Sequence, residues 1–133
     1  PSHTSYANYK GTGALSEPES KALANLANSR NWTMTISYHS MGNLVYWDFA
    51  GNKVAEQSKA IAELVTGITG YRINRSSGKG GFKDYVQIKD SPIPSLTIEV
   101  GSVACPMPVS EFGNVWNSNQ SILAALAAYA ADH

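Results

Sequence analysis

The chain has 133 residues, of which 43% are apolar and 15% are charged, an ordinary balance for one globular domain with a sizeable core. Ten basic and ten acidic residues give a formal net charge of zero, which argues against a nucleic acid or an anionic membrane held by bulk charge. The sequence contains no apolar run of about 18 residues, so it predicts no transmembrane helix. Its single cysteine, Cys105, excludes an internal disulfide.

Helical and strand patterns alternate along the chain, separated by segments rich in Gly, Pro, Asn and Ser. Alternation of this kind predicts an α/β fold. The strand predictions rest on runs of β-branched and aromatic residues, and the helix predictions on apolar residues at helical spacing. In chain order, the sequence predicts a loop over 1–16, a helix over 18–28, a strand over 33–38, a turn over 40–43, a short strand over 44–47, a helix over 52–66, a short strand over 69–73, a loop over 76–81, a weakly alternating segment over 82–88, a turn over 90–94, a strand over 95–100 and a helix over 109–131.

The first predicted helix has a well-marked start. Pro18 stands in its first turn, and Ser16 with Glu19 has the spacing of a capping box. We therefore expect Ser16 to be the N-cap. The last helix contains residues that predict an interruption near Gly113 or within 117–119.

Two of the predicted strands end in polar residues that a hydrophobic core would not favour. The first strand leads into His39, and the strand over 95–100 carries Glu99 near its end. Ligands bind at the carboxyl ends of strands in open α/β sheets, so the pair could form half of a metal site with its general base. The alternative is a histidine hydrogen-bonded in the core and a glutamate paired with an arginine. One His and one Glu do not decide between the two.

Four segments, taken in order along the chain, carry a further signal. They are Tyr9-Lys10-Gly11 with Ser16-Glu17-Pro18-Glu19, then Tyr38-His39-Ser40-Met41-Gly42-Asn43-Leu44-Val45, then Gly80-Gly81-Phe82-Lys83-Asp84-Tyr85, and finally Thr97-Ile98-Glu99. Together they resemble motifs of the zinc carboxypeptidase (funnelin-type metallocarboxypeptidase) family. The third segment, followed by the fourth, is most similar to the bacterial branch of that family that acts on cell-wall peptides, the γ-D-glutamyl-diaminopimelate peptidases.

The resemblance implies a mixed-sheet α/β/α fold, of which residues 1–133 would be the C-terminal half. His39 would be the third zinc ligand, Glu99 the general base that activates the attacking water, and Ser40 a residue lining the substrate site. The family's other two ligands come from a His-x-x-Glu segment, which this sequence does not contain. Because zinc sites need three or four protein ligands, we expect this chain alone to bind zinc weakly or not at all and to be inactive. A truncated sheet would also favour self-association or an N-terminal partner chain.

Three further residues are candidates for substrate binding within that resemblance. Tyr71 would be the tyrosine that closes over the substrate, or else a tyrosine that anchors the core or a loop. Lys83 would suit a carboxylate on the substrate side chain and Asp84 an amine, and a diaminopimelate side chain carries both groups. A solvated surface ion pair is the alternative for Lys83 and Asp84.

The resemblance thus implies a zinc metallopeptidase with Zn2+ as its cofactor and a peptide substrate, favouring a muropeptide cut at a diaminopimelate-type residue. Such an enzyme would act outside the cell or in the cell envelope. Two alternatives stay open: a general carboxypeptidase that acts on protein C-termini, and a non-catalytic binding domain that keeps the fold without the metal. The carboxylate of Glu99 counts against the binding domain, which has no need of it.

Overall fold

The computed structural model of the protein describes residues 11–76 and 81–133. Residues 1–10 and 77–80 lie outside the described part, and with them Tyr9, Lys10 and Gly80 of the family-like segments. The chain divides into two compact units, one up to Trp32 and one from Thr33 to His133.

The first unit contains helix α1, Pro18–Asn28. Pro18 occupies the first helical turn as predicted, but the N-cap is Glu17 and no side chain caps the helix. The expected capping box is therefore wrong. The Ser16 hydroxyl instead accepts a hydrogen bond from the Thr12 amide (3.1 Å) and donates one to the Glu17 carboxylate (2.9 Å), so it closes the preceding turn.

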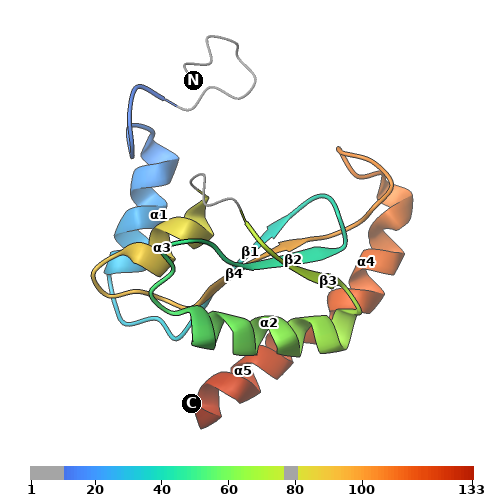
Figure 1. Cartoon of the computed structure of the whole chain (residues 1–133). Coiled ribbons are helices and arrows are strands. Elements are labelled where there is room, and N and C mark those ends of the chain that lie inside the picture. Colours follow the sequence, from blue (N-terminus) through green and yellow to red (C-terminus); the bar gives the residue numbers. More distant parts are fainter. Residues whose placement is uncertain (1–10, 77–80) are drawn as a thin grey trace. The chain divides into compact units, whose positions relative to one another are not determined.

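The second unit is built on a four-stranded mixed sheet with the strand order β1-β4-β2-β3 (Figure 1). The outer pairs β1–β4 and β2–β3 are parallel, and the central pair β2–β4 is antiparallel. The carboxyl ends of β1 and β4 therefore lie at the same end of the sheet as the amino ends of β2 and β3. The strands are β1 Thr35–His39, β2 Leu44–Asp48, β3 Arg72–Arg75 and β4 Ser95–Glu99.

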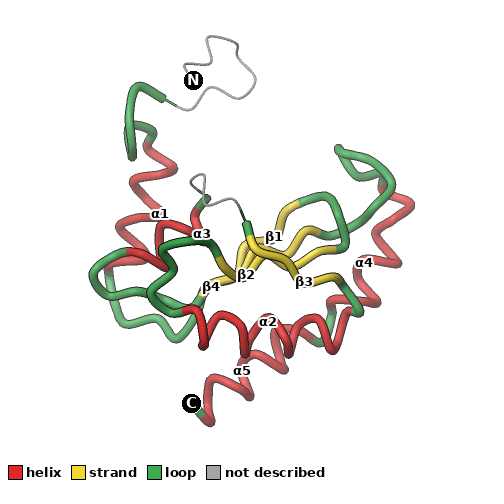
Figure 2. Tube along the Cα trace, viewed as in Figure 1, coloured by secondary structure: helices red, strands yellow, loops and turns green. Residues whose placement is uncertain are grey.

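Two helices cover one face of this sheet, as the tube in Figure 2 shows. They are α2, Ala55–Thr69, and α5, Ile122–Asp132. Their apolar faces and the buried side of the strands form one core, which removes a large apolar area from water and supplies most of the driving force for folding. The core residues are Val45, Ile61, Ala62, Val65, Leu96, Ile98, Val100, Ile122 and Leu126.

The remaining elements differ in part from the sequence-based expectations. The weakly alternating segment over 82–88 is helix α3, Phe82–Ile88, whose buried residues 83, 84, 86 and 87 recur at helical spacing. The expected strand over 69–73 starts later, because α2 runs on to Thr69 and ends at Gly70 with φ +70°, a left-handed cap that glycine adopts without strain.

The predicted interruption of the C-terminal helix is confirmed, although it lies a little later than expected. A 3-10 turn, Val109–Glu111, leads into α4, Phe112–Asn119, and the chain breaks at Gln120 and Ser121 before α5. The architecture is thus α/β, as predicted. None of the helices in the described part of the chain is long and apolar enough to cross a membrane.

A buried amide ties α3 to the sheet at the end away from His39. Gln87 is 0% exposed, and the two N–H groups of its Nε2 are shared among three acceptors: the Trp47 carbonyl (2.8 Å), the Ser95 carbonyl (2.9 Å) and the Ser58 hydroxyl (3.1 Å). These acceptors belong to β2, β4 and α2. One side chain therefore satisfies buried polar groups on three separate elements, which the surrounding apolar residues could not do.

Replacing this amide should be costly. We expect Gln87→Leu to lower the free energy of unfolding by about 3 kcal/mol, because buried acceptors left without a donor cost roughly 1–3 kcal/mol each. Urea unfolding followed by circular dichroism measures the change. The exposed Gln57 on α2 provides the control. Gln57→Leu should change stability by less than about 0.5 kcal/mol, as exposed substitutions usually do. Equal effects of the two variants would contradict the role assigned to Gln87.

Candidate functional site

The strand register aligns His39 and Glu99 side by side. His39 is the Cα partner of Glu99 in the parallel pair β1–β4, Glu99 is the partner of Leu44 in the antiparallel pair β4–β2, and Leu44 is the partner of Arg72 in β2–β3. Partners in register point to the same face of a sheet. His39, Glu99, Leu44 and Arg72 therefore form one row across all four strands, called the end row below.

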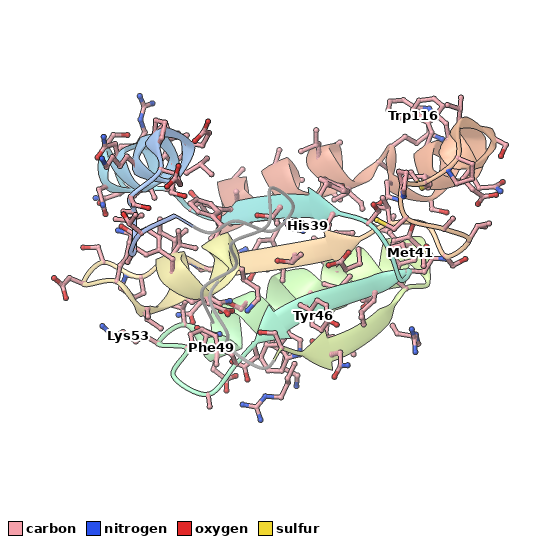
Figure 3. The ribbon with its side chains drawn as sticks, turned by 90° about the horizontal axis from the view of Figure 1, so that it is seen from above. His39, Met41, Tyr46, Phe49, Lys53 and Trp116 are labelled. Carbon is pink, nitrogen blue, oxygen red and sulfur yellow. The ribbon has the colours of Figure 1, made fainter. Side chains whose placement is uncertain are left out.

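The end row lies on the face opposite the hydrophobic core. Successive residues of a strand alternate between faces, and Ile98 and Val45, which neighbour Glu99 and Leu44 in sequence, belong to the core. Figure 3 looks down onto the other face, with α2 and α5 behind the sheet and with His39 and Tyr46 labelled. The next row on this face, two residues further from the strand ends, consists of Ser37, Thr97, Tyr46 and Asn74.

The face that carries the end row is polar, in contrast to the face that packs against α2 and α5. Hydroxyls of Ser37, Thr97 and Tyr46 follow the end row, and the Thr35 and Ser95 hydroxyls, 2.7 Å apart, follow in the next row. The side chains of His39 and Glu99 are both accessible, since His39 is exposed and Glu99 is half-buried. A polar, partly accessible sheet face beside a His and a Glu can hold a polar ligand against the two side chains.

Backbone hydrogen bonds hold the strand ends in this alignment. The His39 carbonyl accepts from the Val100 amide (2.8 Å), and the Gly101 carbonyl accepts from the amides of Gly42 (2.7 Å) and Asn43 (3.1 Å). Gly101 has φ +73° and Asn43 has φ +47°, left-handed values that suit these residue types. The turn after β1, whose Ser40–Met41 peptide bond is cis, is thus fastened to the residues after β4.

Ser40 lies next to His39, at the start of the turn after β1. It is exposed and follows His39 directly. Its hydroxyl is 3.8 Å from the Cys105 sulfur, which brings the loop after β4 up to the turn after β1. A substrate role for Ser40 stays a prediction.

Tyr71 is placed by contacts on the core side of the sheet. Its side chain packs against the hydrophobic core, and its hydroxyl accepts a hydrogen bond from the Asn119 side-chain amide (2.9 Å) of α4. Burial raises the pKa of Tyr38 above its ordinary value, and the neighbouring Tyr71 raises it further. In this conformation Tyr71 anchors α4, while its predicted substrate role stays a prediction.

Lys83 and Asp84 are not the solvated surface pair that was the alternative for them. They are 3% and 7% exposed and form an ion pair with each other on α3. The Lys83 ammonium also donates to the Gln87 side-chain oxygen (3.3 Å) and lies 5.0 Å from the centroid of the Phe49 ring. The Ser76 hydroxyl donates to Asp84 (3.4 Å). These contacts belong to the same buried network as Gln87, and a role in substrate binding stays a prediction for both residues.

Sequence reasoning did not identify Ser37, Thr97 or Tyr46 as neighbours of Glu99, and it did not place Arg72 in the same row. Their positions follow from the register and from the antiparallel pairing of β2 with β4, which is a long-range property. The available signal was the alternation of polar and apolar residues in Thr35–His39 and Ser95–Glu99, which becomes informative once the strands are paired.

The residues present fit one part of a zinc site. His39 is an accessible imidazole with an accessible carboxylate beside it in register, which is a suitable ligand and base arrangement. Across residues 11–76 and 81–133, however, no three His, Cys, Asp or Glu side chains gather closely enough to hold a metal ion. A complete zinc site therefore requires ligands beyond those found in the described part.

Comparisons with known proteins found two relatives, one of which is named as an endopeptidase. The chain is 33% identical over 118 residues to "Gamma-D-glutamyl-L-diamino acid endopeptidase 1" of Lysinibacillus sphaericus, a match that covers 88% of this chain and 29% of that protein. It is 26% identical over 125 residues to "Uncharacterized protein YqgT" of Bacillus subtilis (strain 168), covering 92% of this chain and 33% of that protein. The chain thus spans about a third of the length of these relatives. No family model matches it, and no solved structure does.

The stability of the connection between the ends of β1 and β4 should depend on the absence of a side chain at Gly101. A Cβ there would lie 2.5 Å from the Met107 sulfur, and φ +73° is unfavourable for alanine. We expect Gly101→Ala to destabilise the protein by about 2 kcal/mol, through the left-handed backbone and the displaced methionine. The change can be measured as a lower midpoint of urea unfolding.

Gly113 in α4 is the matched control, because a Cβ there would meet nothing within 4 Å. Gly113→Ala should stabilise the protein by roughly 0.5–1 kcal/mol, since alanine is favoured over glycine in a helix. A loss of stability in both variants, or in neither, would contradict the role of Gly101.

Proposed function

We propose that this chain is the C-terminal part of a zinc-dependent peptidase that hydrolyses the amide between a γ-D-glutamyl residue and a diamino acid in cell-wall peptides. The observation that carries the proposal is the pairing of His39 with Glu99, in register and on the polar face, at the carboxyl ends of β1 and β4. The name of the Lysinibacillus relative supports the substrate class. The carboxypeptidase-type motifs around His39 and Glu99 support the reaction type.

Each residue of the pair has a role in the proposed reaction. Zinc, when bound, would supply Lewis acidity and lower the pKa of a bound water toward about 7. His39 would provide one imidazole ligand. Glu99 would take a proton from the attacking water as general base and then pass it to the leaving amine. Because Glu99 is half-buried beside an exposed His39, its carboxylate can reach a ligand placed over the sheet.

The polar rows next to the pair suit a peptide that carries charged and hydrogen-bonding groups. Ser37, Thr97 and Tyr46 offer hydroxyls as donors and acceptors directly behind the end row. We propose that the bound peptide lies over this face, with Ser40 at its edge. Lys83 contacts Asp84 and Gln87 in this conformation, so the proposed contact of Lys83 and Asp84 with a diamino acid side chain would require this ion pair to open.

Activity would depend on sequence upstream of this chain. The match to the relatives spans about a third of their length, which leaves room for the two missing ligands elsewhere in such a protein. We propose that the 133 residues alone are inactive and bind zinc weakly, and that the complete protein acts outside the cell or in the cell envelope. An endopeptidase that recognises a γ-glutamyl bond is favoured over a general carboxypeptidase by the name of the Lysinibacillus relative.

The first test of the proposal removes the base. In the full-length protein that contains this chain, Glu99→Gln should abolish turnover of a γ-D-glutamyl-diamino acid peptide, by at least roughly 100-fold, while zinc content stays the same. Activity is followed by chromatography of the released amine and zinc by mass spectrometry of the metal. Glu63→Gln is the control, because Glu63 is exposed on α2, on the other face of the sheet. A Glu99→Gln enzyme that turns over normally would exclude Glu99 as the base.

The second test removes the proposed ligand. His39→Ala should lower the zinc content of the full-length protein well below one ion per chain and weaken zinc affinity by at least roughly tenfold, because a ligand is lost. Equilibrium dialysis against a zinc buffer measures the affinity. His133, an exposed residue at the end of α5, provides the matched control, and His133→Ala should leave zinc binding unchanged. If the His39 variant keeps its zinc, His39 is not a ligand and the zinc site does not lie at this row.

A further inference from the structure

The guanidinium of Arg72 occupies the far end of the end row, on the same face as Glu99. Arg72 is exposed, and it forms no ion pair with any carboxylate in residues 11–76 and 81–133. The other arginine of β3 behaves differently, because Arg75 pairs with the buried carboxylate of Asp48 at 2.7 Å. Arg75 thus has a structural partner, whereas Arg72 offers its charge to the polar face.

Contacts bring the Arg72 guanidinium toward Glu99. Its Nη2 donates to the Gly42 carbonyl (3.4 Å), and a Cβ built on Gly42 would lie 3.7 Å from the Cβ of Glu99. Adjacent strands are about 4.8 Å apart, so two strand spacings, or about 10 Å, separate the backbones of Arg72 and Glu99. A long arginine side chain lying along Gly42 shortens that separation. The contact with the Gly42 carbonyl thus places the cation at the same end of the sheet as Glu99.

The chemistry of the proposed substrate supplies an anion at such a place. A γ-linked glutamyl residue is joined through its side-chain carboxyl, so its α-carboxylate stays free a few bonds from the scissile carbonyl. The diamino acid on the other side of the bond carries a carboxylate of its own. Guanidinium groups match carboxylates through two parallel hydrogen bonds, which fix orientation as well as charge.

We propose that Arg72 is a specificity-determining residue that binds a free carboxylate of the peptide next to the scissile amide. With the glutamyl α-carboxylate as its partner, Arg72 would distinguish a γ-linked peptide from an α-linked one, in which that carboxyl is part of the peptide bond; with the diamino acid carboxylate as its partner, Arg72 would select for that residue instead. Arg72 does not take part in proton transfer and acts on binding. This inference rests on the proposed function, because the substrate class comes from there.

The test uses the full-length protein containing this chain and three synthetic peptides. One is a γ-D-glutamyl-diamino acid peptide with both carboxylates free, one has the glutamyl α-carboxylate amidated, and one has the diamino acid α-carboxylate amidated. For the first peptide, Arg72→Gln should raise KM roughly 10- to 100-fold with little change in kcat, the effect of losing a charge-assisted hydrogen-bonded pair. Lys59→Gln, which removes an exposed cation from α2 on the opposite face, should have no effect.

The amidated peptides identify which carboxylate Arg72 binds. The peptide that lacks the partner carboxylate should bind wild-type protein about as weakly as the free peptide binds the Arg72→Gln variant, and the variant should show no further loss with it. An equal loss with all three peptides would overturn the inference, because Arg72 would then act on the fold or on the site in general.

Binding by calorimetry, measured in a Glu99→Gln background, separates this inference from the proposed function. If peptide binds with the expected dependence on Arg72 but the protein with intact Glu99 hydrolyses nothing, the carboxylate site stands and the peptidase proposal fails. If hydrolysis occurs and Arg72→Gln binds all peptides as wild type does, the peptidase proposal stands and the carboxylate site is overturned. If no peptide binds, both fail.

Discussion

The parallel pairing of β1 with β4 is the constraint on which the candidate site depends. Its register makes His39 the partner of Glu99, although the two residues are far apart in the sequence. A shift by one residue would turn one of the two side chains into the core face, because side chains alternate along a strand. The carbonyl of His39, bonded to the Val100 amide, and that of Gly101, bonded to the turn after β1, fasten the register at the end where the chemistry would occur.

Polar side chains are accessible at one end of the sheet and buried at the other. At the end of β1 and β4, the fold leaves polar side chains accessible, so that a ligand can meet them. At the other end, Gln87, Lys83 and Asp84 are buried, and their polar atoms bond to one another and to the backbone of β2 and β4. A buried ion pair adds little net stability, because desolvation offsets the attraction. The bonds of Gln87 to the Trp47 and Ser95 carbonyls hold α3 against the strands. The end row, in contrast, forms no ion pair within the described residues.

Local patterns were sufficient to predict most elements, and they failed where tertiary contacts decide. The apolar and β-branched runs around Ile36 and Ile98 predicted their strands correctly, because each strand buries one face. The alternation at 82–88 was misleading, because Lys83 and Asp84 are buried, whereas charged side chains usually lie at the surface. The motifs around His39 and Glu99 led to the candidate pair, but the companions of that pair in the end row depend on an antiparallel β2–β4 contact that no local pattern encodes.

The position of His39 in the end row limits how the proposed zinc site can be completed. β1 is an outer strand of the sheet, so its second edge has no strand partner among the residues of the second unit that the structure describes. On the inner side, Glu99 and then Leu44 follow, and helices α2 and α5 fill the opposite face. Additional ligands for a metal at His39 therefore have to approach over the free edge of β1 or from above the polar face. Arg72 lies at the other end of the row, so metal ligation and carboxylate recognition would be separated by Glu99, the residue that must act between them.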